Sequence, residues 1–461
     1  MNTARTCLSS SFALALLFIV SVRANLSAAD PAVDLPRNRF DPRLRKFVAA
    51  KEQHARALAK EFQFEAAPEM WDYFEANLNG DWPTVRRLFR DLARRSRPSG
   101  DGVVDVSVHN LVWPPLMEAQ LGYECFEAMD IKFVDAFARG VIDAIPRGEI
   151  YFGGTDPGRG VITAFVKSHA EADPFFVLPQ NPLADSLYLQ YLRAIYGKKI
   201  SIPDEDDRNR AFKEYKTDAG IRLDEGRLKP GEQVFRNDGQ IEFNGTVAIM
   251  EVNAILAKLI FDRNPKREFY VEESFVLDWM YPHLTPHGLI LKLNRQPLSE
   301  ISESAVQKDR DYWRRQTARF LGDWLKEETS LQTVCEFVER VYRDGDLEGF
   351  KGDALYVTAE RNHSPRLLFG KLRHAQANLY EWRFKRAKAA AEKRAMQRAA
   401  ELAYKQVLAL CPDSPEYVRR LVVWLREQDR LEDARRVLEA GRQINPGSKR
   451  LGELADELKA N

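Results

Sequence analysis

The sequence predicts a fold of the α/β or α+β class: a small, largely parallel sheet flanked by helices, with an all-helical hairpin before it and a helical-repeat region after it. A helical pattern runs directly into a short β-rich run twice, at residues 132–145 into 149–152 and at residues 246–261 into 268–272. Strands that alternate with helices favour parallel pairing, because a parallel connection needs a long crossover. The helical-repeat region is indicated by a period of 34 residues near the C-terminal end.

The first 29 residues have the pattern of a secretory signal peptide. Arg5 precedes an apolar run over residues 12–22, and the small residues Ser27, Ala28 and Ala29 follow. The apolar run is shorter than the ~20 residues that cross a bilayer. We therefore expect export to the periplasm or the extracellular space after cleavage behind Ala29, with an uncleaved anchor as the less favoured alternative.

Five regions are expected along the chain. They are a signal peptide (1–29), a helical leader and hairpin (30–100), an α/β domain (101–305), a helical region (306–394) and a tetratricopeptide-like repeat (395–461). In the hairpin, Trp71, Phe74 and Leu78 recur at helical spacing over residues 68–78, and residues 82–95 show the same period. Gly80 lies in the turn between the two helices.

The remainder of the α/β domain contains a further strand and a polar excursion. Residues 289–293 (LILKL) are predicted to form a third strand. Residues 208–223 are predicted to be helical, with a loop or hairpin near residues 237–239.

The C-terminal period is carried by several residue pairs. Pro412 and Pro446 are 34 residues apart, and the same spacing relates Ala400 to Ala434, Tyr404 to Leu438 and Leu410 to Ile444. This pattern resembles the tetratricopeptide repeat, in which stacked helix pairs bury one continuous core. It predicts a protein partner for this region; a generic helical hairpin is the alternative.

The composition excludes several classes of protein. An apolar fraction of 44% is enough for a buried core, and a net charge of +1 with 30% charged residues argues against a nucleic-acid-binding protein. Cys125, Cys335 and Cys411 lie too far apart for metal-ligand spacing and are expected to be buried apolar fillers. The signal region aside, no segment is long and apolar enough to span a membrane, and no cofactor motif is found.

The segment IYFGGTDPGRG, residues 150–160, is the most specific motif. A strand that ends in glycines places backbone N–H groups at the carboxyl edge of a sheet, where open α/β folds bind ligands. The ligand-binding candidates here are Gly153, Gly154, Thr155, Asp156 and Arg159, and the polar stretch that follows adds Lys167 and His169. Asp156 would bind a cation or a sugar hydroxyl, and Arg159 a phosphate; a plain β-turn is the alternative.

A second group of acidic residues follows the predicted strand 268–272. If this strand neighbours the first, Glu272, Glu273 and Asp278 reach the same edge as Asp156. Paired carboxylates can act as acid and base or hold a cation. The alternative is that Glu272 and Glu273 are solvated residues at a helix start.

Two other patterns were weighed as sites. His283 and His287 have the spacing of a zinc helix, but the proline before each disfavours a regular helix and with it a metal site. The basic run over residues 383–398 is expected to be an exposed helical face, with a membrane or partner contact as the alternative.

Two stretches resemble a known bacterial family. The first is Ile145-Pro146, Ile150-Tyr151-Phe152 and Gly154-Thr155-Asp156, and the second runs from Asn264-Pro265 to Phe269-Tyr270. They are similar to the soluble C-terminal region of multi-spanning membrane proteins of unknown function that are related to protein O-mannosyltransferases. The resemblance covers residues 130–320 and the helical tail. Because the sequence lacks the multi-spanning transferase portion, the resemblance implies an extracytoplasmic accessory module.

Two functions follow as hypotheses. The first is an exported binding or scaffold protein, whose α/β domain recognises a polar or sugar ligand and whose helical repeats dock a protein. The second is a carbohydrate-active enzyme for glycosyl transfer or hydrolysis, with Asp156, Glu272, Glu273 and Asp278 supplying acid, base or cation ligands.

Overall fold

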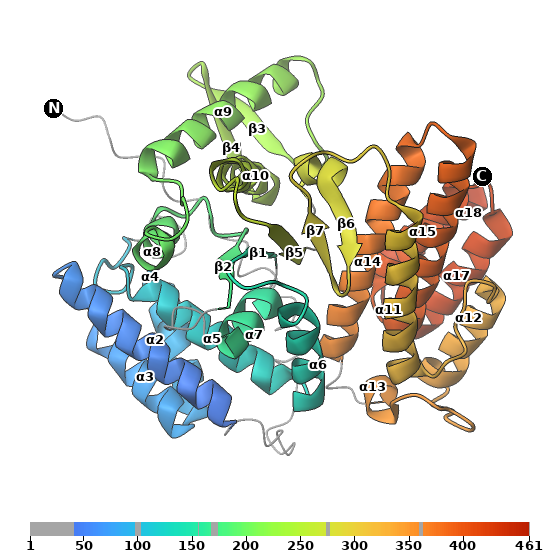
Figure 1. Ribbon diagram of the computed structural model, residues 1–461, viewed down its shortest axis with the longest axis horizontal. Helices are drawn as coiled ribbons and strands as arrows, with labels where there is room; N and C mark the ends of the chain where they lie inside the picture. Colours follow the sequence, from blue (N-terminus) through green and yellow to red (C-terminus); the bar gives the residue numbers. More distant parts are fainter. Residues whose placement is uncertain are drawn as a thin grey trace. The chain divides into compact units, whose positions relative to one another are not determined.

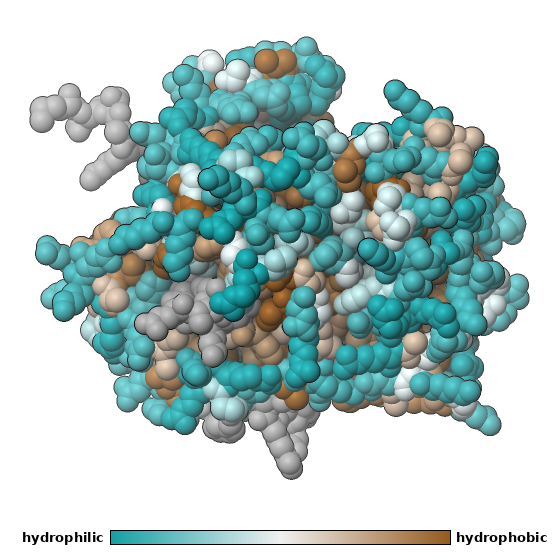
Figure 2. Space-filling view, viewed as in Figure 1, coloured by the Kyte–Doolittle hydropathy of each residue, from teal (hydrophilic) through white to brown (hydrophobic). Residues whose placement is uncertain are grey.

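The computed structural model describes residues 41–96, 103–154, 156–166, 174–272, 277–358 and 363–460. The predicted signal peptide, residues 1–29, lies outside these ranges. Within them, no helix has the length and apolar character needed to cross a bilayer. The face of the molecule seen in Figure 2 is mostly hydrophilic, with small and separate hydrophobic areas.

The described chain divides into two compact units. Figure 1 shows the helices and strands, coloured from the N-terminus to the C-terminus. Unit 1 comprises the described residues within Met1–Glu127 and Arg147–Phe269, and unit 2 those within Ala128–Pro146 and Tyr270–Asn461. The elements of unit 1 are α2 (Pro42–Glu61), α3 (Pro68–Asn79), α4 (Trp82–Ser96), α5 (Trp113–Ala128), β1 (Ile150–Gly153), α7 (Asp156–Val166), β2 (Phe176–Pro179), α8 (Ser186–Tyr196), α9 (Glu205–Asp224), β3 (Gln233–Asn237), β4 (Gln240–Asn244) and α10 (Thr246–Arg263).

Unit 2 is mainly helical and has three short strands. Its elements are α6 (Ile131–Ile142), β5 (Phe269–Glu272), η2 (Asp278–His283), β6 (Leu284–His287), β7 (Ile290–Leu293), α11 (Glu303–Leu321), α12 (Leu331–Val338), η3 (Glu339–Arg343), α13 (Ala354–Thr358), α14 (His363–Arg386), α15 (Ala390–Leu410), α16 (Pro415–Glu427), α17 (Leu431–Ile444) and α18 (Lys449–Ala460). The boundary between the units falls inside β5, after Phe269.

The predicted fold class is confirmed: the described chain is mostly helical with a five-stranded sheet, and both of its ends are helical. The strand order is β2-β1-β5-β7-β6, and the sheet is mixed. Strand β1 pairs with β2 in parallel, as expected for two strands joined through the helix α7. Strand β7 pairs with β6 in antiparallel fashion, with Leu293 opposite Leu284.

The N-terminal hairpin forms as predicted. Helix α3 ends at Gly80, which has a φ of 72° that only glycine adopts at no steric cost. In α4 the predicted apolar face is buried and consists of Val85, Leu88, Phe89 and Leu92. In α3 Phe74 is buried as well, whereas Trp71 and Leu78 are half-buried.

Two strands were not predicted from the sequence. Strands β2 and β6 each contain a proline, Pro179 and Pro286, and proline argues against a strand in a sequence pattern. The presence of β6 accounts for the two histidines: His283 closes the 3-10 helix η2 and His287 lies in β6, so they share no helical face.

Candidate functional site

The glycine-rich segment leads from β1 into a helix rather than into a turn. All four residues of β1 are buried, and α7 starts at Asp156, inside the glycine-rich motif 150–160. A Cβ atom on Gly160 would lie 2.7 Å from the backbone carbon of Leu121 in α5. This glycine therefore lets α7 and α5 pack backbone against backbone, and that contact brings the first turn of α7 to the polar residues of α5.

Arg159 lies in that first turn and faces α5 and α8. Its guanidinium carbon is 4.4 Å from the ring centre of Tyr188, a cation–π distance. Its Nε atom is 4.0 Å from Glu118 Oε1, at the limit of an ion pair. The Arg159 side chain is 12% exposed, so it is the partly accessible member of a group that is otherwise buried.

Glu118 is the centre of this group. The Nζ atom of Lys51 donates to Glu118 Oε2 over 2.6 Å, and the two side chains are only 1% and 2% exposed. The hydroxyls of Tyr188 and Tyr191 also donate to the carboxylate, over 2.7 Å and 3.0 Å. A buried carboxylate needs such partners, because an unpaired charge in the interior is strongly unfavourable. We call Lys51, Glu118, Arg159, Tyr188 and Tyr191 the Glu118 cluster.

The protonation states in the cluster follow from burial. Burial, with the neighbouring Glu118 charge adding to it, raises the pKa of Tyr188 and of Tyr191 well above the usual value, so both phenols stay proton donors. The ring of His54 lies 5.6 Å from that of Tyr191. Burial and the Lys51 ammonium lower the pKa of His54 to about 4, so its imidazole is neutral at neutral pH.

The carboxyl end of β1 is braced by amide side chains. Asn181 Nδ2 donates to the carbonyl oxygen of Gly154 over 2.7 Å. Asn253, buried in α10, donates to the Asn181 carbonyl oxygen over 2.6 Å and accepts from the Ala184 N–H over the same distance. These bonds hold the loop between β2 and α8 against the start of the glycine-rich segment.

Three of the predicted ligand-binding residues lie in the described connection from β1 into α7. Gly153 ends β1, Gly154 follows it, and Arg159 lies in the first turn of α7. Thr155, Lys167, His169 and Glu273 lie outside the described residues, and so does the side chain of Asp156, although Asp156 opens α7.

Glu272 and Asp278, the other predicted acidic residues, are in different surroundings. Glu272 is fully buried in unit 2 and accepts a 2.8 Å bond from Lys371 Nζ of α14. Asp278 is exposed in the first turn of η2. The ion pair makes Glu272 a structural anchor of α14.

The sequence analysis missed Lys51, Glu118, Tyr188 and Tyr191. A signal for Lys51 was present, because the buried residues of α2 are Leu44, Phe47, Val48, Ala55 and Leu58, and Lys51 continues their helical spacing. Glu118 is likewise an acid within a mostly apolar helix. A charge on a buried stripe predicts a buried partner, but the spacing alone does not identify that partner.

Metal ligation is not indicated in the described part of the chain. No three histidine, cysteine, aspartate or glutamate residues gather there as a metal would require. The ring of His283 bonds the carbonyl oxygen of Asn294 and that of His287 the carbonyl oxygen of Ala144, each over 2.8 Å. The described cysteines, Cys125, Cys335 and Cys411, are buried and unbridged, as predicted.

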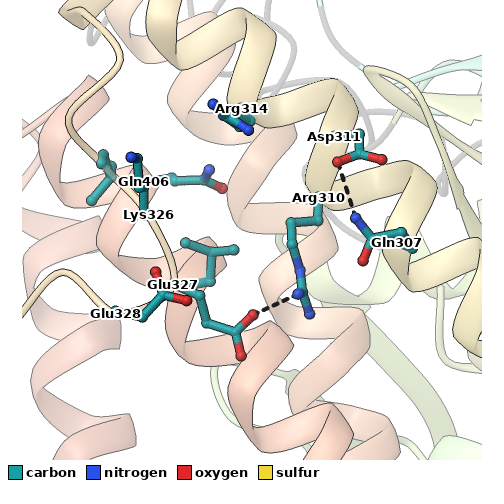
Figure 3. Close-up of a pocket in the computed structure, with 10 residues that line it drawn as sticks. Gln307, Arg310, Asp311, Arg314, Lys326, Glu327, Glu328 and Gln406 are labelled. Carbon is teal, nitrogen blue, oxygen red and sulfur yellow. Dashed lines mark hydrogen bonds and ion pairs between the residues drawn. The ribbon is translucent and has the colours of Figure 1, made fainter.

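A hollow of about 280 Å³ lies in unit 2 between α11, α15 and the segment before α12. Polar and charged side chains dominate its lining, which comprises Gln307, Arg310, Asp311, Arg314, Leu325, Lys326, Glu327, Glu328, Leu402 and Gln406. Figure 3 shows that Arg310 is engaged with Glu327, at 2.8 Å, and Gln307 with Asp311, at 3.0 Å. One ion pair, Arg310–Glu327, thus lies within this lining, and none of its residues was a sequence candidate.

Comparison with known proteins found no matching family model, no matching curated protein and no matching solved structure. The resemblance to the soluble region of mannosyltransferase-related membrane proteins therefore stays a prediction.

Proposed function

We propose that this chain is a binding protein. Its unit 1 would recognise a polar ligand that carries a carboxylate or phosphate, at the connection between β1 and α7. The observation that carries the proposal is the placement of Arg159. This side chain is partly exposed, yet its orientation is set by the Tyr188 ring and by the buried Glu118. A guanidinium held in place loses little entropy on binding, and its planar set of donors fits carboxylate and phosphate oxygens.

Two further features support an anionic ligand. Arg159 lies in the first turn of α7, where backbone N–H groups and the helix dipole favour negative charge. The asparagine brace at Gly154 and Asn181 fixes the loop beside this turn, so the polar groups are arranged before a ligand arrives.

A scaffold role for the C-terminal helices is the second part of the proposal. It is supported by the 34-residue correspondence: Ala400 in α15 and Ala434 in α17 are both fully buried. Asn445, just after α17, donates to the carbonyl oxygen of Pro412, just after α15, over 2.9 Å. Small buried residues at equivalent positions in corresponding helices of successive pairs are what stacked helix pairs require.

The described acidic residues give the enzyme alternative little support. Of its four carboxylates, Glu272 is tied to Lys371 and Asp278 is exposed, each in unit 2. The side chains of Asp156 and Glu273 lie outside the described residues. Glycoside hydrolysis by two carboxylates therefore stays a prediction.

A thermal-shift screen tests the binding proposal. The full chain would be scanned with inorganic phosphate, sugar phosphates, sugar nucleotides and neutral glycan fragments. A ligand at about 100 times its dissociation constant should stabilise the fold by roughly 2.7 kcal/mol. We expect an anionic compound to stabilise the wild type, and Arg159→Gln to lose the effect.

The matched control is Arg222→Gln. Arg222 lies in the same unit, its side chain is 13% exposed, and it also lies over a ring, that of Tyr215. Its substitution should leave the ligand effect intact. Stabilisation by neutral glycans alone, or an effect that survives Arg159→Gln, would contradict the proposal.

A further inference from the structure

A short segment of unit 1 exposes three valines. Val103 is 91% exposed, Val106 is 80% exposed and Val104 is 42% exposed. Single apolar side chains on a surface are ordinary, but three within four positions make an apolar patch. We call residues 103–106 the valine segment.

The valine segment is fastened to the end of α4. The Asp105 N–H donates to the carbonyl oxygen of Arg95 over 3.1 Å, and Arg95 Nε donates to Asp105 Oδ2 over 2.9 Å. On its other side, the carbonyl oxygen of Ser107 accepts from the N–H of Ala67 over 2.8 Å. The three valines are therefore presented at a fixed place beside α4.

Helix α4 turns an arginine face to solvent. Its apolar side is buried, and its exposed side carries Arg86, Arg87, Arg90 and Arg94. Arg86 pairs with Glu127 and Arg94 with Asp91. Among the described residues, no carboxylate lies within ion-pair distance of Arg87 or Arg90. The exposed valines are thus fastened to the end of the helix whose exposed side carries these arginines.

We propose that the valine segment and the arginine face of α4 form a surface that docks on an anionic lipid bilayer. The valines would enter the boundary between headgroups and acyl chains, and Arg87 and Arg90 would contact lipid phosphates. A bilayer fits this surface better than a protein does. Three valines with no aromatic anchor cover far less than the ~800 Å² that each partner buries in a specific complex.

Vesicle co-sedimentation of the full chain tests the proposal. The vesicles contain either phosphatidylcholine alone or phosphatidylcholine with phosphatidylglycerol. We expect stronger binding to the second kind, weakened by salt. Arg87→Gln/Arg90→Gln should weaken binding to the anionic vesicles by roughly thirtyfold at low salt, since each cation contributes about fivefold. Val103→Ser/Val106→Ser should weaken binding at low and at high salt.

Controls of the same chemistry are available in unit 1. Lys198→Gln/Lys199→Gln removes two exposed cations that follow α8, and Ile221→Ser removes an apolar side chain that is 53% exposed. Both should bind vesicles as the wild type does. The proposal is overturned if the wild type stays in the supernatant, or if the controls weaken binding as much as the test variants. It is also overturned if the valine variant binds normally, or if inorganic phosphate or soluble polyglutamate competes fully with the vesicles.

Discussion

The buried ion pair of Lys51 and Glu118 should be strongly coupled in a double-mutant cycle. Lys51→Met keeps most of the side-chain volume but leaves Glu118 as a buried carboxylate without its ammonium partner, which is 2.6 Å away in the wild type. Glu118→Gln does the reverse and leaves a buried ammonium. Removing one member of such a pair costs about 3–5 kcal/mol.

The double variant Lys51→Met/Glu118→Gln should be less destabilised than the sum of the single variants. No buried charge is stranded in it, and the glutamine oxygen can still accept from the Tyr188 hydroxyl. We expect a coupling energy of about 3 kcal/mol, measured by urea unfolding at neutral pH with circular dichroism detection. The lowest-urea transition would be followed, because two units need not unfold together.

An exposed ion pair of the same helix is the control. Glu52 and Arg56 in α2 are 2.7 Å apart, and their side chains are 20% and 55% exposed. Glu52→Gln should change the stability by no more than about 0.5 kcal/mol. Single-variant costs that add within about 0.5 kcal/mol would refute the role given to the Lys51–Glu118 pair.

Three further predictions concern acid stability, thiol reactivity and packing. Burial lowers the pKa of His374 to about 4, below its unfolded value of about 6.5, so its neutral form adds up to about 3 kcal/mol of stability. That contribution is present above the unfolded pKa and is lost as the pH falls toward 4; urea midpoints across this range should show the loss, and His374→Gln should reduce it. Burial raises the pKa of the Cys335 thiol to about 12 and raises that of Cys411 well above its usual value. Both thiols should therefore resist alkylating reagents in the native chain and react once the chain is unfolded. Rapid labelling of either cysteine in the native chain would contradict their burial. Gly160→Ala should lower the free energy of unfolding by about 1–3 kcal/mol, because the new Cβ meets the backbone of Leu121. Gly452→Ala in α18 should raise it by up to about 1 kcal/mol, because no atom lies within 4 Å of the new Cβ. Equal thermal shifts for the two variants would refute the packing argument.

The sequence was informative where a helical period extended over several turns, and where a short apolar run followed such a helix. Helix α4 was predicted with its buried face, and β1 and β5 were each placed to within a residue. The first turns of α7 were not predicted, because glycine and proline at residues 157–160 are typical of a turn, whereas here they lie in a helix. Proline is tolerated there because its missing N–H would have had no partner in the helix.

The Glu118 cluster could not be assembled from the sequence. Lys51 and Glu118 are 67 residues apart, and Glu118 and Tyr191 are 73 apart. Each lies on a different helix, and their meeting depends on how α2, α5 and α8 pack. Arg159 was predicted as a site residue from its local motif, but the partners that orient it come from that packing.

Buried charges alone do not identify a site in this protein. Unit 2 contains a comparable pair, Arg373 and Asp309, which are 2.7 Å apart and 1% and 2% exposed. That pair is enclosed: Gln406 and Gln376 accept from the same guanidinium, and Gln376 in turn donates to the Gly288 carbonyl oxygen beside β7. Such an enclosed network can fix how α14 packs. A buried ion pair is by itself weak evidence for a gain in stability, and this one has no access to a ligand. In the Glu118 cluster one cation, Arg159, reaches solvent at the carboxyl edge of the sheet. The partial exposure of Arg159, rather than the burial of charge, is why we propose ligand binding for unit 1 and scaffolding for unit 2.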